Sequence, residues 1–103
     1  MLKFLYFGNS KSDAACVPVT LLRQMAIDDD SNQVTFRFED IGDGIGEQVI
    51  LSVDTNTDKA KDVVDEVAHA IRTSKSPFIV VGDDVNNQYI SKEITDVNSV
   101  SIT

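Results

Sequence analysis

The sequence has few residues of the kinds that most often carry chemistry or covalent cross-links. Among its 103 residues are one cysteine, one histidine and no tryptophan. A single cysteine, Cys16, excludes an intramolecular disulfide, so nothing in the chain requires an oxidising compartment. Its neighbours Ala15 and Val17 supply no positive charge that would activate the thiol. Cys16 is therefore predicted to be a small, buried apolar residue.

Basic residues are scarce as well. Nine lysines and arginines stand against seventeen aspartates and glutamates, which gives a formal net charge of -8. An acidic chain repels phosphate backbones and anionic lipid surfaces, so nucleic acid is disfavoured as a partner. A nucleic-acid platform would require one sheet face to gather basic residues that are scattered along the chain, namely Lys3, Arg23, Arg37 and Lys92.

Long apolar runs are absent too. No stretch approaches the roughly 18 consecutive apolar residues of a membrane helix. The apolar start at residues 1–8 lacks the basic region and the cleavage site of a signal peptide. We therefore expect no membrane partner, and a protein that lies in the cytoplasm or is bound in an assembly. With 42% hydrophobic and 25% charged residues, the composition is that of one folded domain spanning residues 1–103.

Alternating patterns predict five or six strands. Residues 2–7 are apolar on both faces, which indicates a strand inside a sheet. Residues 78–81 form a short apolar run that is typical of a central strand covered on both sides. Residues 17–27 are predicted as one extended segment, although a helical turn also fits residues 21–26. The remaining predicted strands are residues 34–39, residues 48–53, and a final bent strand over 89–95 and 100–102.

One helix is predicted over residues 58–74, ahead of Pro77, which prevents its continuation. Its single apolar stripe consists of Ala60, Val63, Val64, Val67, Ala68 and Ile71. The predicted fold class is α+β, with five or six mostly antiparallel, bent strands and this helix between the fourth and fifth strands. Either an open sheet or a small SH3/Sm-like barrel fits that order of elements.

Acidic turns are the candidates for a metal site. Asp28 and Asp30 begin a spacing that matches part of a calcium loop, continued by Asn32 and Glu39. Gln33, however, stands where the sharp turn of such a loop needs glycine, and the alternation of residues 34–38 would carry Glu39 away along a strand. A solvated turn is therefore favoured over a calcium site.

Asp83 and Asp84 form a second acidic pair, directly after a predicted central strand. Carboxylates at strand ends often line clefts and can bind magnesium, yet Asn86 and Asn87 follow, and together these residues favour a solvated turn. His69 lies one helical turn from Asp65, which favours a surface ion-pair network over base chemistry. The glycines at positions 42, 44 and 46 do not match a dinucleotide-binding loop. No catalytic residue, cofactor or cofactor-binding residue is predicted.

Two segments carry a resemblance to other proteins. The opening Leu-Lys-Phe-Leu-Tyr-Phe at residues 2–7 and the segment Pro-Phe-Ile-Val-Val-Gly-Asp-Asp-Val-Asn at residues 77–86 resemble short uncharacterised proteins of marine bacteriophages and marine metagenomes. These motifs are hydrophobic strands and turns, so the resemblance transfers no active site. It implies a virion-associated or accessory phage protein.

The strand patterns give the functional expectation. Strands that are apolar on both faces and an exposed-looking final strand are commonly satisfied by neighbouring subunits. The sequence therefore predicts a non-enzymatic structural or assembly protein that acts as a homo-oligomer. The alternatives are a small-barrel binding module for a small ligand, peptide or nucleic acid and, ranked last, an enzyme that uses Asp83 or Asp84 with a metal.

Overall fold

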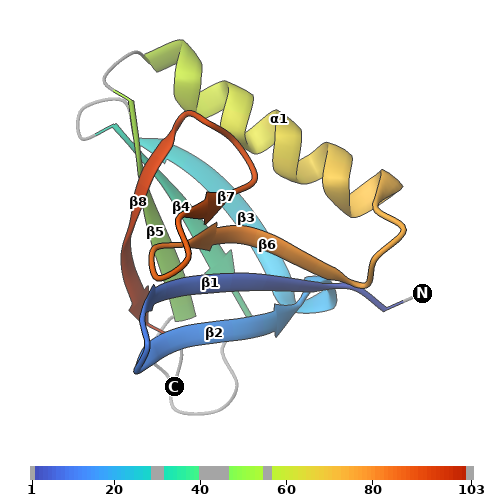
Figure 1. Cartoon of the computed structure of the whole chain (residues 1–103). Helices are drawn as coiled ribbons and strands as arrows, with labels where there is room; N and C mark the ends of the chain where they lie inside the picture. Colours follow the sequence, from blue (N-terminus) through green and yellow to red (C-terminus); the bar gives the residue numbers. More distant parts are fainter. Residues whose placement is uncertain (1, 29–31, 40–46, 55–56, 102–103) are drawn as a thin grey trace.

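A computed structural model describes residues 2–28, 32–39, 47–54 and 57–101, which form two β-sheets and one α-helix (Figure 1). A short 3-10 helix at Val19–Leu21 interrupts the strands. Along the chain the elements are β1 (Phe4–Ser10), β2 (Asp13–Pro18), β3 (Leu22–Asp28), β4 (Gln33–Phe38), β5 (Glu47–Val53), α1 (Thr57–Thr73), β6 (Phe78–Asp83), β7 (Gln88–Tyr89) and β8 (Ile94–Ser101).

Each sheet has four strands. The first sheet has the order β2-β1-β6-β7, and the second has the order β3-β4-β5-β8. Every pairing is antiparallel except that between β1 and β6. The α+β class and the mostly antiparallel strands were predicted correctly. The strands form two sheets, whereas the sequence predicted either a single open sheet or a small barrel.

The strand count and the position of the helix differ from the prediction. The segment 17–27 was predicted as one extended piece, but the 3-10 helix that follows Pro18 divides it between β2 and β3. Proline fixes its own φ and has no N–H to donate, so it suits the end of an edge strand and the start of a turn. The first strand also extends further than the predicted residues 2–7, since β1 runs to Ser10, and β2 begins at Asp13, ahead of the predicted segment. The helix therefore follows the fifth strand, whereas it was expected after the fourth.

The core lies between the two sheets. Phe7 of β1 packs against Phe36 and Phe38 of β4, with ring centroids 5.1 and 6.0 Å apart in edge-to-face geometry. Aromatic pairs in this geometry add about 0.5–1.5 kcal/mol beyond their buried area. Leu5 and Leu51, from opposite sheets, are fully buried beside them. The alternation seen in the sequence of β4 and β5 thus places every second side chain in one shared core.

Helix α1 lies across one end of the two sheets (Figure 1). Its apolar stripe enters the core through Ala60, Val63 and Val67, which are all buried. Valine is a mediocre helix former, so the helix depends on this docking. At its C-terminal end the ammonium of Lys3 donates a hydrogen bond to the carbonyl of Ile71, 2.5 Å away. That bond fastens the last turn to the start of β1 and places a positive charge at the negative end of the helix dipole.

The two sheets come into close contact at Gly82 of β6. A Cβ atom at this position would lie only 2.8 Å from Cγ2 of Val97 in β8 and 3.5 Å from Cδ1 of Tyr89. Glycine is required here because the opposite sheet already occupies the space that a side chain would take. The contact joins the middle of one sheet to the edge strand of the other.

Replacing Gly82 with alanine is expected to destabilise the protein by about 1–3 kcal/mol, because the added methyl group must push β8 away. The matched control is Gly8→Ala, whose Cβ would meet the hydroxyl of Tyr6 at 2.9 Å on the outer side of the sheet. That hydroxyl ends a side chain that can turn aside, so the loss is expected to be smaller. Chemical denaturation of both variants measures the difference. Equal stability losses would contradict the close approach.

Candidate functional site

The carboxylate of Asp83 closes the turn that follows β6. Asp83 is 5% exposed, and its Oδ1 accepts the backbone N–H groups of Val85 at 3.1 Å and Asn86 at 3.3 Å. Its Oδ2 accepts the side-chain amide of Asn86 at 2.8 Å. Asn87 completes the turn with a φ of 53°, a left-handed conformation that asparagine tolerates better than most residues. Asp83 thus stabilises the turn that follows it.

The neighbouring carboxylate of Asp84 links both sheets. Its Oδ1 accepts the hydroxyl of Tyr89 at 2.6 Å. Both of its oxygens accept the backbone N–H of Val97 in β8, at 3.0 and 3.1 Å. The amide of Asp84 also donates to the carbonyl of Gly8 at 2.9 Å. Because the pairing of β8 with β5 is irregular beside Val97, this carboxylate satisfies a backbone donor where the regular ladder breaks.

The predicted metal candidates are therefore not gathered into one site. Asp83 and Asp84 direct their oxygens to N–H and O–H donors of the fold. Asp28 is exposed at the end of β3, and Asp30 lies outside the described residues. Among the residues that the structure describes, no group of three or more histidine, cysteine, aspartate or glutamate side chains is arranged to hold a metal ion.

The other side chains considered from the sequence as ligands or catalytic groups lie on the surface. Glu39, proposed as the distal ligand of a calcium loop, pairs with Arg23 at 3.0 Å on the surface. Asp65 pairs with Lys61 at 3.2 Å, and His69 is exposed on the same helix. The glycine-rich loop at 42–46 lies outside the described residues.

Burial and acidic neighbours raise the pKa of Tyr89 from 10.0 to about 12. Desolvation is the largest cause, followed by the hydrogen bond to Asp84 and the negative charges of Asp84, Asp96 and Asp83. All of these causes favour the neutral phenol over the phenolate. Tyr89 therefore serves as a hydrogen-bond donor that holds its proton tightly, which is the opposite of an activated tyrosine.

This shift predicts how stability depends on alkaline pH. The folded protein keeps the Tyr89 proton when the unfolded chain has already lost it, so the contribution is complete below pH 10 and is lost as pH rises towards 12. The melting temperature is expected to fall across this window, and the fall is expected to be shallower in Tyr89→Phe. Thermal melts at half-unit pH steps make the measurement. Identical pH profiles for the two proteins would contradict the assignment.

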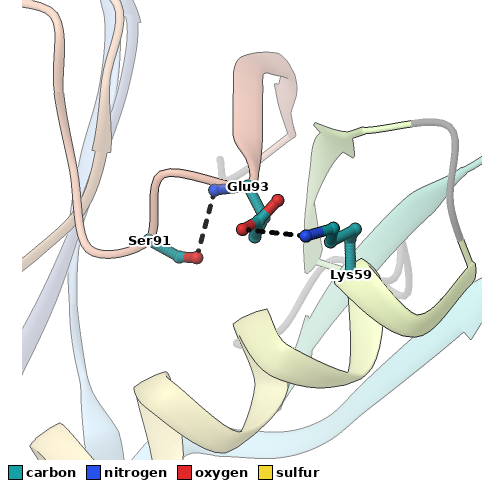
Figure 2. Close-up of polar contacts among 3 residues, drawn as sticks. All are labelled: Lys59, Ser91 and Glu93. Carbon is teal, nitrogen blue, oxygen red and sulfur yellow. Dashed lines mark hydrogen bonds and ion pairs between the residues drawn. The ribbon is translucent and has the colours of Figure 1, made fainter.

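A second buried polar cluster joins the chain after β7 to the start of α1. Ser91 and Glu93 are 3% and 8% exposed, and the hydroxyl oxygen of Ser91 accepts the backbone N–H of Glu93 at 3.2 Å. Figure 2 shows Lys59 of α1 reaching Glu93, with Nζ 3.4 Å from Oε1. The carbonyl of Glu93 also accepts the amide of Asp54 at 3.0 Å. Glu93 therefore fastens three separate segments together.

The partial burial of the Lys59–Glu93 pair predicts a measurable coupling. A double-mutant cycle with Lys59→Met and Glu93→Gln is expected to give about 1 kcal/mol, near the upper end for ion pairs that keep some access to solvent. The control cycle uses Lys61→Met and Asp65→Asn, a pair whose side chains are 73% and 63% exposed. That pair is expected to couple by about 0.3 kcal/mol. Chemical denaturation measures both coupling energies. Equal values would show that the burial of Glu93 does not strengthen its ion pair with Lys59.

Open hollows flank the helix. One, of 470 Å³, is lined by acidic residues of α1 and by the segment 90–93. An adjoining hollow of 410 Å³ has Ala70 and Ile90 beside His69. A third, of 440 Å³, lies near Leu2 and the C-terminal end of α1. The first two share Asp65, Glu66 and Ile90, so they form one acidic groove along the exposed side of the helix.

The outer face of the first sheet is apolar. Strand alternation puts Leu5, Phe7 and Val17 in the core, so their neighbours along β1, β2 and β6 point outwards. We call these outward residues the outer face; they are Phe4, Tyr6, Ala14, Cys16, Pro18, Phe78 and Val80. None of them carries a charge, and none packs against the core.

The exposure of this face corrects two predictions. Residues 78–81 were expected to be covered on both sides, yet Phe78 is 47% exposed, and its ring lies 5.6 Å from that of Tyr6 on the same face. Cys16 was expected to be buried, and it is exposed. Partial desolvation by its apolar neighbours raises the pKa of the thiol. The sequence signal for this face was present in the apolar outer positions of residues 2–7, but it indicates an interior strand equally well.

The basic residues do not form one surface. Arg23 and Arg37 lie on the second sheet, where Arg37 binds Gln24 at 2.9 Å. Lys3 caps the helix, and Lys92 lies between β7 and β8. The hypothesis that these four basic residues share one sheet face is therefore wrong.

Comparison of the chain with protein-family models, with curated proteins and with solved structures found no match. No described helix is both long enough and apolar enough to span a membrane.

Proposed function

We propose that this protein is a non-enzymatic structural or assembly subunit that acts as a homo-oligomer through the outer face. The observation that carries the proposal is the contrast between the two sheets. The outer positions of β1, β2 and β6 are apolar, whereas the second sheet carries mainly polar groups on its outer side, among them Gln24, Thr35, Arg37, Gln48 and Ser52.

Charge supports a second copy of this chain as the partner. Each copy has a net charge of -8, so two copies repel each other wherever their acidic surfaces meet. The outer face has no charged side chain, and it is therefore a surface on which two copies can meet without placing like charges in contact. Exposed apolar residues of this kind are typical of interaction surfaces.

The polar clusters support a role without catalysis. Asp83, Asp84 and Glu93 are engaged with backbone groups and with partners inside the fold, and Tyr89 holds its proton tightly. These contacts stabilise turns and join the sheets. The filled space between the sheets likewise favours a structural role over a ligand-binding barrel, because Phe7, Phe36 and other core residues occupy it.

The place of action is part of the same proposal. A virion or phage assembly is supported by the resemblance of residues 2–7 and 77–86 to short proteins of marine bacteriophages. Both segments contribute to the outer face, through Phe4, Tyr6, Phe78 and Val80. The alternative location is the cytoplasm.

Phe78→Glu tests the proposal. A carboxylate within an apolar interface must be desolvated without a partner, so the association constant is expected to fall at least tenfold, or about 1.4 kcal/mol. Light scattering over a concentration series measures the mass of the wild-type protein and of the variant. The wild type is expected to exceed the mass of one chain, and the variant to remain near it.

The control is Thr35→Glu, which adds the same charge to the outer side of the second sheet. Its association is expected to match that of the wild type. A wild-type chain that is monomeric at every concentration, or two variants that weaken association equally, would remove the support for the outer face.

A further inference from the structure

The two free sides of the first sheet are unequal. The short strand β7 forms one edge, and β2 forms the other. An edge strand exposes unpaired N–H and C=O groups that can pair with another strand, and natural proteins usually protect such edges with charges, bulges or proline. Residues 14–18 of β2 contain no charge, and the register with β1 shifts only between Gly8 and Ser10, beyond this stretch.

The register of β2 identifies which groups face away from the sheet. Val19 donates its N–H to the carbonyl of Lys3, and Phe4 donates its N–H to Pro77, on the side of β6. Because peptide groups alternate along a strand, the odd-numbered residues of β2 pair with β1. The N–H and C=O groups of Ala14 and Cys16 therefore point outwards, and both residues are exposed.

Proline limits this edge at one end. Pro18 has no N–H, and the 3-10 helix begins directly after it and turns the chain towards the second sheet. The usable part of the edge is therefore centred on Ala15. This length suits a short, self-complementary pairing, since Ala14 of one strand can lie opposite Cys16 of another.

Building on the proposed function, we propose that the partner at this edge is β2 of a second copy, paired antiparallel with Ala14 opposite Cys16 of the other chain. In this arrangement each Ala14 and each Cys16 exchanges both its N–H and its C=O with the opposite residue. All outward donors of the stretch find acceptors, and a twofold axis passes beside Ala15. Small side chains at the joint leave room for the second strand.

The area of the outer face favours edge pairing over simple stacking. Three strands about 4.8 Å apart and about 17 Å long cover only about 240 Å². Stable interfaces bury about 800 Å² of accessible surface per partner, so association through the outer faces gains from a larger continuous surface. Pairing along β2 joins two outer faces into one continuous apolar surface of about twice that extent. The joined sheet therefore gains hydrogen bonds and a larger surface for further association.

The pairing places the two Cys16 residues diagonally across the joint, about 7–8 Å apart. Incubating the wild-type chain with a short bismaleimide is expected to yield a covalent dimer, because this thiol is the only one in the chain. The control places a single thiol on the second sheet by combining Cys16→Ser with Thr35→Cys. That protein is expected to give at least tenfold less covalent dimer at the same concentration.

Two variants of Ala14 test the edge while keeping Cys16. Ala14→Pro removes one outward N–H without removing a bond to β1, and Ala14→Glu keeps the amide but sets a carboxylate from each copy into the joint. Both are expected to abolish cross-linking while retaining the wild-type circular dichroism spectrum. Ala14→Glu also places a charge on the outer face, so the loss of cross-linking in the proline variant assigns the contact to the edge. If the proline variant fails to fold, cross-linking that survives in Ala14→Glu still overturns the β2 pairing.

The outcomes separate this inference from the proposed function. Oligomers that form without Cys16 cross-linking, or that survive both Ala14 variants, overturn the β2 pairing and leave the outer face as the interface. A chain that stays monomeric by light scattering overturns both, and leaves the edge to a strand of a different protein.

Discussion

The fold depends on how closely β6 approaches β8. Gly82 allows Val97 to come within contact of the β6 backbone, and Asp84, two residues later, binds the amide of Val97. The same carboxylate binds Tyr89, while its own amide holds Gly8 of β1. One short stretch thus aligns both sheets. Because the sheets meet here, their inner faces can share a single aromatic and aliphatic core.

That constraint also determines what the acidic residues do. Asp83, Asp84 and Glu93 each satisfy backbone or side-chain donors that would otherwise lie unpaired. The exposed acids on α1 and at the strand ends keep the surface negative. Such a surface opposes random contact between copies and leaves the uncharged outer face as the place where contact costs least.

The spacing of apolar residues correctly predicted the helix and the strands that bury one face. The helix was located to within one residue, and β4 and β5 followed from strict alternation of buried and exposed side chains. The division of residues 17–27 was missed because the 3-10 helix depends on where the second sheet lies, which local pattern does not encode. The roles of Asp84 and Glu93 were missed for the same reason, since their partners are distant along the chain. Apolar residues facing outwards cannot be told from core residues by sequence pattern alone, and Cys16 and Phe78 were misjudged on that account.

The central claim is that the first sheet is the self-associating side of this protein. Hydrogen–deuterium exchange of the wild-type chain, measured at dilute and at high protein concentration, tests it most directly. We predict that exchange in β2 (Asp13–Pro18) slows as protein concentration rises. Exchange in β3 (Leu22–Asp28), an edge strand of the second sheet, is expected not to change. Exchange in β2 that is independent of concentration, or protection that appears in β3 instead, would contradict the claim.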